Sequence, residues 1–222
     1  MQLSVAQVGL SYGDRPVLKD VSFTLAAQDS ALLLGPSGSG KSSLLNIVCG
    51  LQTPDSGTVT LGDSVVASAS GVADSDEARR RSMGIIFQTL RLVSALTLRG
   101  NLLLAQKLQS GAHDPDLIES TLLKLGIAHR SEARPFELSQ GEAQRAAIAR
   151  ALVVKPKLLI ADEPTSSLDA ANTQKVASLL LELAKDAGAS LLVATHDDRL
   201  TPYFANTMTL SEGTLEHAKV SA

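Results

Sequence analysis

Residues 30–48 read SALLLGPSGSGKSSLLNIV, in which a glycine-rich loop separates a short apolar run from a segment with helical spacing. Residues 35–42 match the pattern G-x-x-x-x-G-K-[ST], which binds phosphate where a strand precedes it and a helix follows it. The run Ser30–Leu34 predicts that strand, and Lys41–Val48 predicts that helix. This stretch therefore predicts a strand, loop and helix unit of an α/β protein.

The glycines of this loop have a mechanical role. They let the backbone turn tightly, so that several N–H groups and the positive end of the helix converge on phosphate oxygens. We expect Lys41 to reach the β and γ phosphates of ATP and the Ser42 hydroxyl to bind Mg²⁺. A glycine-rich turn without a ligand is the alternative, while the dinucleotide-binding pattern G-x-G-x-x-G is absent. The residues expected to contact the nucleotide are Gly35, Pro36, Ser37, Gly38, Ser39, Gly40, Lys41, Ser42 and Ser43.

A second motif is an apolar strand that ends in two acids. Leu158–Ala161 is followed by Asp162 and Glu163, at the sheet edge where α/β proteins bind their ligands. We expect Asp162 to hold Mg²⁺ through water and Glu163 to act as the general base that polarises the attacking water. An acidic strand cap before Pro164 is the alternative. The phosphate loop favours the catalytic interpretation, because bound Mg-ATP requires a second metal anchor.

The remaining pattern predicts an α/β fold, a P-loop NTPase core with a mainly parallel sheet, an N-terminal antiparallel β subdomain and an α-helical subdomain. We expect a single domain, 1–222, in which 1–87 and 155–222 form the nucleotide-binding core and 88–154 form the helical subdomain. Gly62–Ser75 is expected to be a surface loop. Strands are expected at Thr58–Leu61, Met83–Phe87, Leu158–Ala161 and Leu191–Thr195, and as an antiparallel pair within Leu3–Leu25. Helices are expected at Leu98–Leu108, Pro115–Leu125, Gln140–Val154 and Ala171–Ala187.

Composition excludes several classes of protein. With 222 residues, 44% hydrophobic and 19% charged, the chain can bury one core without disulfides, and the lone Cys49 is expected to be buried. A net charge of −3 and an aromatic content of 3% argue against a nucleic-acid surface, so Arg79–Arg81 is interpreted as a solvated helix end. Neither a signal peptide nor a run of ~18 apolar residues is found, so we expect no spanning helix. Three histidines without metal-ligand spacing are expected to be exposed: His113, His129 and His217.

A third motif, Leu138–Glu142, reads LSQGE and opens a predicted helix. Ser139 and Glu142 have the spacing of a capping box, which predicts Ser139 as the N-cap and leaves free N–H groups that attract anions. A plain capping box is the alternative, but it leaves Gly141 unexplained, since glycine early in a helix costs up to ~1 kcal/mol against alanine. With the two motifs above, this sequence closely resembles the ATP-binding subunits of ABC transporters, whose signature is LSGGQ, and the family's motif order is matched from Tyr12 to His196.

The resemblance implies that two copies bind two ATP molecules head to tail. In the family, the residues matching Ser139 and Gly141 contact the γ-phosphate of ATP bound to the other subunit. Gln140 stands where the signature has glycine, and Glu142 where it has glutamine, which brings a negative charge near the expected phosphate. We expect Glu142 to fold back onto the backbone as a capping residue, because N–H donors then hold part of its charge. Glu142 is therefore counted with the nucleotide-contacting residues.

Four further positions take their expected roles from the resemblance. Tyr12 resembles the aromatic residue that stacks on adenine, with simple packing as the alternative. Gln88 resembles the glutamine that senses Mg²⁺ and the attacking water and links to the membrane partner. Ser167-Leu168-Asp169 resembles the loop through which two subunits touch each other's sites, so Asp169 is counted at the nucleotide. His196 resembles the histidine that contacts the γ-phosphate and orients the catalytic glutamate, with a structural role as the alternative.

The resemblance also implies an activity and partners. We expect an ATP hydrolase that uses ATP and Mg²⁺, pairs with a second copy, and docks its helical subdomain and the Gln88 region on an integral-membrane permease. It is expected to lie peripherally on the cytoplasmic face of the membrane and to bind no nucleic acid. The branch resembled is the lipoprotein-releasing, macrolide-export and cell-division one, although importer subunits stay open. The rivals are a soluble ABC ATPase acting on nucleic acid or ribosomes, which usually has two ATPase domains or a coiled-coil insert, and a small-molecule kinase, which leaves Gly141, Asp169 and His196 unused.

Overall fold

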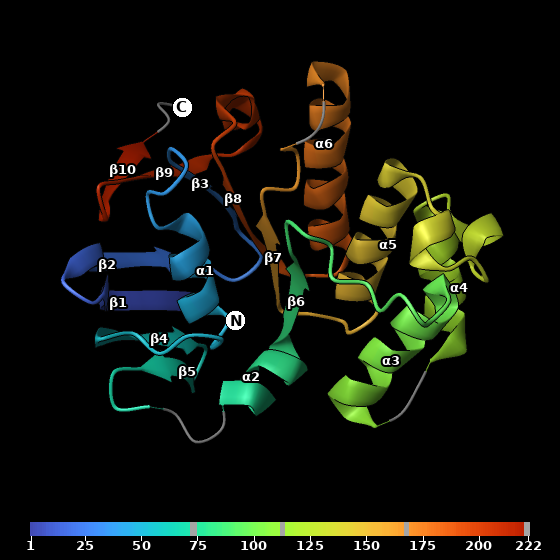
Figure 1. The fold of residues 1–222 in the computed structure, drawn as a ribbon, viewed down its shortest axis with the longest axis horizontal. Coiled ribbons are helices and arrows are strands. Elements are labelled where there is room, and N and C mark those ends of the chain that lie inside the picture. Colours follow the sequence, from blue (N-terminus) through green and yellow to red (C-terminus); the bar gives the residue numbers. More distant parts are fainter. Residues whose placement is uncertain (72–74, 112–113, 167–168, 220–222) are drawn as a thin grey trace.

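The computed structural model describes residues 1–222 except 72–74, 112–113, 167–168 and 220–222, and its larger sheet runs through the centre of the molecule (Figure 1). Its strand order is β10-β9-β3-β8-β7-β6. Neighbouring strands are parallel except for β10, which is antiparallel to β9. The strands are β3 (Ser30–Leu34), β6 (Met83–Ile86), β7 (Leu158–Asp162), β8 (Ser190–Thr195), β9 (Asn206–Ser211) and β10 (Thr214–Lys219). The mainly parallel sheet predicted from the apolar runs is confirmed.

A smaller antiparallel sheet has the order β2-β1-β4-β5. Its strands are β1 (Leu3–Tyr12), β2 (Arg15–Leu25), β4 (Ser56–Leu61) and β5 (Ser64–Ser68). The prediction of a surface loop at Gly62–Ser75 is wrong for Ser64–Ser68, which form β5. This strand pairs with β4 across the two-residue turn Gly62-Asp63. Gly62 has φ +59°, as such a hairpin turn requires, and Val66 of β5 is fully buried.

Helices lie on both sides of the larger sheet. α1 (Lys41–Val48) follows β3, and α2 (Ser75–Ser82) precedes β6. The other long helices are α3 (Leu98–Ser110), α4 (Pro115–Lys124), α5 (Gln140–Leu152) and α6 (Ala170–Asp186), and each agrees with its predicted range to within two residues at either end. Three short 3₁₀ helices complete the list: η1 (Ala128–Arg130), η2 (Pro135–Glu137) and η3 (Asp198–Tyr203). Within the described residues, no helix is long and apolar enough to cross a membrane.

The larger sheet is buried on both faces, which explains its continuous apolar strands. Successive side chains point to opposite sides, so Leu33 and Leu192 pack with α1 and the smaller sheet. Their neighbours Leu32 and Val193 pack with α3, α4, α5 and α6. On this second face α5 lies directly against β6, because a Cβ on Gly84 would stand 2.2 Å from the Ala151 carbonyl oxygen. The sheet therefore positions both α1 and the C-terminal end of α5.

Candidate functional site

The phosphate loop lies between β3 and α1, as the motif predicts. Its backbone leaves no room for a side chain at Gly35, where a Cβ would stand 2.3 Å from the Leu210 carbonyl oxygen and 2.7 Å from Ser39 Oγ. Gly38 and Gly40 have φ values of +81° and +106°, which L side chains rarely adopt. The buried Ser39 hydroxyl has no hydrogen-bond partner in the part of the chain described. This unpaired hydroxyl fits a loop built to receive an external acceptor such as phosphate.

Lys41 is buried inside the loop, with 5% of its surface exposed. Its Nζ donates to the Gly35 and Pro36 carbonyl oxygens at 2.7 and 3.1 Å. The same ammonium group lies 3.5 Å from Glu163 Oε1. The cation of the first motif is thereby held against the second acid of the strand motif, as the sequence predicts for one common site.

Asp162 and Glu163, at the end of β7, contact different partners. Asp162 Oδ1 accepts a hydrogen bond from Ser42 Oγ at 3.5 Å. Glu163 has φ +50°, an uncommon conformation for a non-glycine residue, and the chain turns there so that its carboxylate faces Lys41. Burial raises the pKa of Asp162; the Ser42 hydrogen bond opposes the shift, the Glu163 charge adds to it, and the Lys41 charge opposes it. A half-buried carboxylate beside a hydroxyl is a donor set that suits Mg²⁺.

The Glu163 carboxylate is also bound from β8. The sheet register ends where Asp162 pairs with Ala194, and this brings Glu163, the residue after β7, next to Thr195 at the end of β8. Glu163 Oε2 accepts from Thr195 Oγ1 at 3.0 Å and from the His196 backbone N–H at 3.4 Å, and His196 Nδ1 lies 2.9 Å away. His196 is therefore in direct contact with the acid that the resemblance pairs with it.

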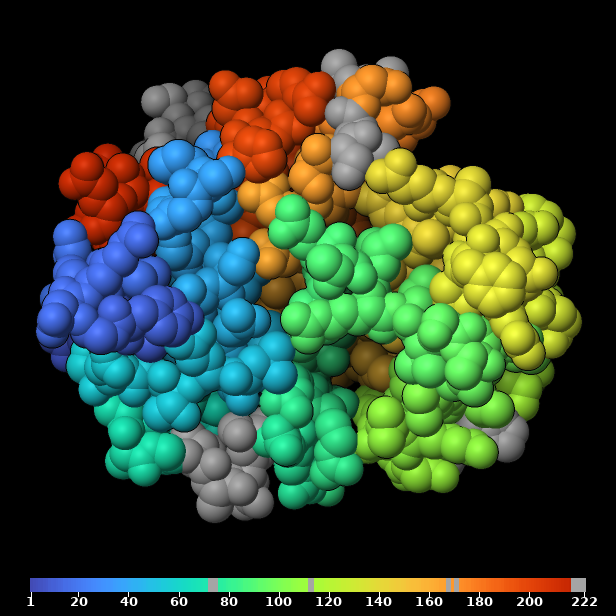
Figure 2. Space-filling view, viewed as in Figure 1, coloured from blue at the N-terminus to red at the C-terminus, as the bar shows by residue number. Residues whose placement is uncertain are grey.

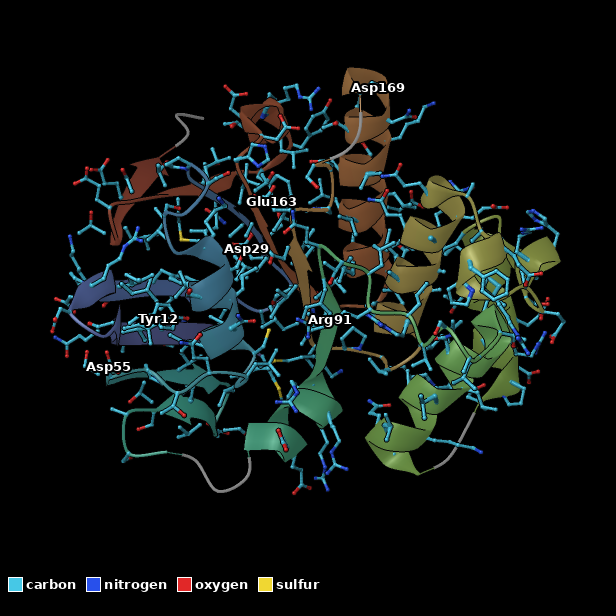
Figure 3. The ribbon with its side chains drawn as sticks, viewed as in Figure 1. Tyr12, Asp29, Asp55, Arg91, Glu163 and Asp169 are labelled. Atoms are coloured by element: carbon cyan, nitrogen blue, oxygen red, sulfur yellow. The ribbon has the colours of Figure 1, made fainter. Side chains whose placement is uncertain are left out.

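Sequence reasoning missed Thr195. Its side chain is completely buried, and its hydroxyl both donates to Glu163 and accepts from the Asp197 backbone N–H at 3.1 Å. A threonine that ends an apolar strand reads as an ordinary β-branched strand residue, so only the strand pairing reveals the contact. Figure 3 shows Glu163 beyond the end of β7, between the α1 side of the molecule and α6.

Tyr12 lies at the end of β1, on the other side of α1 (Figure 3). Its exposed fraction is 55%, which excludes the alternative of simple core packing. Its hydroxyl donates to Gln52 Oε1 at 3.1 Å and lies 3.5 Å from Ser43 Oγ, the hydroxyl next to the loop serine Ser42. The ring is thus tethered beside the phosphate loop with its surface open.

Gln88 lies two residues after the end of β6 and is exposed. It lines a small cavity of about 70 Å³ together with Glu163, Gln140 and Gln144. Gln144 donates through Nε2 to the Pro164 carbonyl oxygen and so links α5 to the segment after β7. The cavity joins the loop after β6, the segment after β7 and the beginning of α5.

The signature segment forms the predicted capping box. Ser139 Oγ accepts from the Glu142 N–H at 3.4 Å, and Glu142 Oε2 accepts from the Ser139 N–H at 2.8 Å. A Cβ on Gly141 would meet only Arg145 Nη1, at 3.8 Å, so packing in the described chain does not require a glycine there. Within the described residues, no hydrogen bond or ion pair joins Ser139 or Gly141 to the loop at 35–43.

Asp169 also lies apart from the loop. It caps α6, with Oδ1 accepting from the Asn172 N–H at 2.8 Å. Figure 3 shows it at the N-terminal end of that helix, at the top of the view. Ser167 and Leu168, the other two residues of the predicted contact loop, lie outside the described residues. The described chain therefore brings Lys41, Ser42 and the strand acids together, while Ser139, Gly141 and Asp169 stand outside this set of contacts.

The other predictions for single residues have mixed outcomes. Cys49 is buried as expected, and burial raises the pKa of its thiol to about 12. His129 is exposed over 67% of its side chain, also as expected, but its Nε2 lies 3.6 Å from Glu142 Oε1. His113 and the side chain of His217 lie outside the described residues. In the described part, no group of three His, Cys, Asp or Glu side chains forms a metal site.

A groove lies between α2 and α3, and Figure 2 shows the hollow between these two segments. Its volume is about 280 Å³, and Met83, Phe87 and Leu108 are among its apolar lining residues. Leu108 is 60% exposed. An adjoining hollow carries a cationic rim of Arg80, Arg81 and Lys107. The groove is therefore apolar along its floor and positively charged at one end.

Comparison with known proteins places this geometry in a family. The ABC transporter family model matches residues 18–166, more than half of the chain. The lipoprotein-releasing system ATP-binding protein LolD of Hydrogenovibrio crunogenus is 39% identical over 202 residues, which cover 89% of this chain and 86% of that protein.

Solved structures agree. A dimeric structure of MJ0796, a bacterial ABC transporter cassette, matches with a TM-score of 0.88 and 28% identity over 99% of both chains. A dimeric post-hydrolysis state of MJ0796 bound to ADP and Pi has a TM-score of 0.87 and 29% identity over 99% of both chains. CbiO1 of Clostridium perfringens, part of the ABC transporter complex CbiONQ, has a TM-score of 0.83 and 29% identity over 96% of this chain and 86% of its own. The chain therefore belongs to the ABC transporter family, as one of its ATP-binding and ATP-hydrolysing subunits.

Proposed function

We propose that the contacts around Glu163 form the catalytic half of an ATP site. Lys41 binds the β and γ phosphates, and the loop at 35–43 wraps them with N–H groups. Glu163 accepts a proton from the attacking water, and His196 holds the carboxylate in place while facing the γ-phosphate. Tyr12 stacks on the adenine. The supporting observation is the chain of contacts from Lys41 through Glu163 to His196, at 3.5 and 2.9 Å.

Mg²⁺ fits the oxygen donors at this site. Ser42 and Asp162 would hold it, and Gln88 would supply a further oxygen ligand from the loop after β6. The metal ion supplies charge neutralisation on the phosphates. The observation that favours it is the facing pair of Ser42 Oγ and Asp162 Oδ1, 3.5 Å apart, next to a buried cation and a second carboxylate.

The other half of the site comes from a second copy. Ser139 and Gly141 bind the γ-phosphate held by the partner copy, with Glu142 as the cap and Asp169 reaching across the pair. Two features favour this arrangement. A Cβ on Gly141 would meet only Arg145 Nη1, at 3.8 Å, and the capped N-terminal turn of α5 has no hydrogen bond or ion pair to the loop at 35–43 within the described residues. A relative with the same fold is dimeric in its solved structure.

The closing motion is passed to a membrane permease. We assign the nucleotide-binding core to 1–87 and 155–222, and the helical subdomain to 88–154, and place the permease in the groove between α2 and α3 with Gln88 near its end. An apolar floor with a cationic rim suits an amphipathic helix that carries acidic residues. The chain then lies peripherally on the cytoplasmic face of the membrane. The 39% identity to LolD favours a lipoprotein-releasing system as the process.

Charge reversal tests the groove. Arg80→Glu with Lys107→Glu is expected to abolish co-purification with the membrane permease, because like charges then meet across the interface. The matched control is Lys19→Glu, an exposed lysine on β2. ATP hydrolysis by the isolated chain serves as the reference for folding. Stoichiometric co-purification of the reversed variant from detergent-solubilised membranes contradicts the proposed docking site.

Thr195 tests the catalytic half. Thr195→Val removes one donor to the Glu163 carboxylate and one acceptor for the Asp197 N–H. The expected result is a kcat about 10- to 100-fold lower with an ATP KM close to that of the unaltered chain, since a lost hydrogen bond to a charged group costs roughly 1.5–3 kcal/mol. Thr195→Ser keeps the hydroxyl and serves as the control. Equal kcat values for the valine and serine variants, measured by phosphate release, contradict a positioning role.

A further inference from the structure

Glu142 places a full negative charge in the first turn of α5, at the end that the proposed function offers to a phosphate. Its two carboxylate oxygens are both occupied. Oε2 accepts from the Ser139 N–H at 2.8 Å and from the Ser139 hydroxyl at 2.7 Å, while Oε1 lies 3.2 Å from Arg130 Nε. These Ser139 hydrogen bonds lower the pKa of Glu142, and the charge of Arg130 adds to the shift, so the group stays ionised.

Arg130 reaches this carboxylate from the last residue of η1, eight positions before Leu138, the first residue of the signature segment. Its Nη2 donates to the Glu137 carbonyl oxygen, at the end of η2 and directly before the signature. One guanidinium therefore holds both the backbone that leads into α5 and the carboxylate in its first turn. His129 Nε2 also faces Glu142, but at 3.6 Å and with 67% of its side chain exposed, so Arg130 is the principal counter-charge.

We propose that Arg130 is a positioning residue for ATP-driven pairing: it neutralises Glu142, so that a second copy's triphosphate can approach Ser139 and Gly141. This inference rests on the proposed head-to-tail pair. A carboxylate within one turn of the γ-phosphate repels it, and only a paired carboxylate leaves the helix N-terminus attractive to anions.

The hydroxyl of Ser139 gives a second reason. A serine has one O–H donor, and here it points at Glu142 Oε2. To donate to the γ-phosphate, Ser139 must rotate that proton away from the carboxylate. Glu142 then keeps the Ser139 N–H and Arg130 as partners, so its charge is still satisfied after the rotation. Without Arg130, the carboxylate competes with the phosphate for the same proton.

The test is a double-substitution cycle in a Glu163→Gln background, which holds ATP without turnover. Arg130→Gln is expected to raise the ATP concentration for half-maximal dimerisation about tenfold, within the range found for coupled neighbouring groups. Glu142→Gln keeps the capping box, since glutamine serves at this position, and is expected to dimerise at the same or a lower ATP concentration. The combined Arg130→Gln, Glu142→Gln chain is expected to regain the parent value. Light scattering during ATP titration measures each.

Two controls separate charge from structure. Arg130→Lys keeps the positive charge. Its ATP concentration for half-maximal dimerisation is expected to stay within about threefold of the parent value, a small change on the scale of coupled neighbouring groups. Arg134→Gln removes an exposed arginine of the same segment and is expected to have no effect. If the Glu163→Gln parent does not dimerise with ATP, the proposed function and this inference both fail. Two results overturn only this inference, provided that the parent dimerises with ATP. In the first, Arg130→Gln dimerises at the same ATP concentration as the parent. In the second, the chain with both Arg130→Gln and Glu142→Gln needs as much ATP as Arg130→Gln alone.

Discussion

Glu163→Gln is expected to lower kcat for ATP hydrolysis by about 10²- to 10⁴-fold, the range for loss of a positioned general base. Glutamine keeps the size of the side chain and an oxygen that can accept from Thr195, but it takes no proton from water. ATP binding should survive, because Lys41 and the loop at 35–43 are unchanged. The altered chain is therefore expected to collect as an ATP-bound dimer, which size-exclusion chromatography with ATP and Mg²⁺ detects.

The matched control is Glu182→Gln, an exposed glutamate on α6 that undergoes the same change of charge. It is expected to hydrolyse ATP at the unaltered rate and to form no trapped dimer. Removal of Mg²⁺ by a chelator should prevent hydrolysis in both chains. Phosphate release by the Glu163→Gln chain at the unaltered rate assigns the proton transfer to another group and removes Glu163 from the mechanism.

The second large effect is a loss of ATP hydrolysis in two altered chains, which is partly restored when the two chains are mixed. Lys41→Met removes the buried cation that faces the phosphates, and Gly141→Asp places a carboxylate where the partner's γ-phosphate is expected. Each chain alone is expected to lose about 10²- to 10³-fold in kcat, the size of effect that follows the loss of one stabilising donor at a transition state. In a head-to-tail pair, one Lys41→Met chain and one Gly141→Asp chain rebuild a single intact site. An equimolar mixture should therefore recover about a quarter of the unaltered activity, as two-fold symmetry requires.

Gly141→Asp is suited to this experiment because the fold does not resist it. A Cβ at this position would make only an ordinary contact with Arg145 Nη1, at 3.8 Å, and an acid in the first turn of a helix is favourable to the helix. Thermal melting should show a chain at least as stable as the unaltered one. A mixture with no more activity than its two components shows that Lys41 and Gly141 act on the same side of the pair, and the head-to-tail arrangement is then wrong.

Local patterns were enough to predict most of the fold. The apolar run at 30–34, the loop at 35–42 and the helix at 41–48 lie where the sequence puts them, because each depends on near neighbours. The capping box at Ser139 was predicted for the same reason, since all its bonds lie within four residues. The strands β9 and β10 had no prediction, although a two-residue turn at Glu212-Gly213, with φ of +49° and +80°, was a readable signal for a hairpin.

What the sequence by itself determined about this protein is which residues are proposed to carry the chemistry: the loop lysine, the two acids at the end of β7 and the serine of LSQGE are recognised by type and spacing. What only the tertiary structure decided is which groups hold them. Thr195 meets Glu163 because two parallel strands pair in one register, and Arg130 meets Glu142 because η1 folds back on α5. These two contacts join residues 32 and 12 positions apart in the sequence, and no local pattern encodes them. They form because the packed elements bring the charged groups together, and a buried charge without a partner would destabilise the fold.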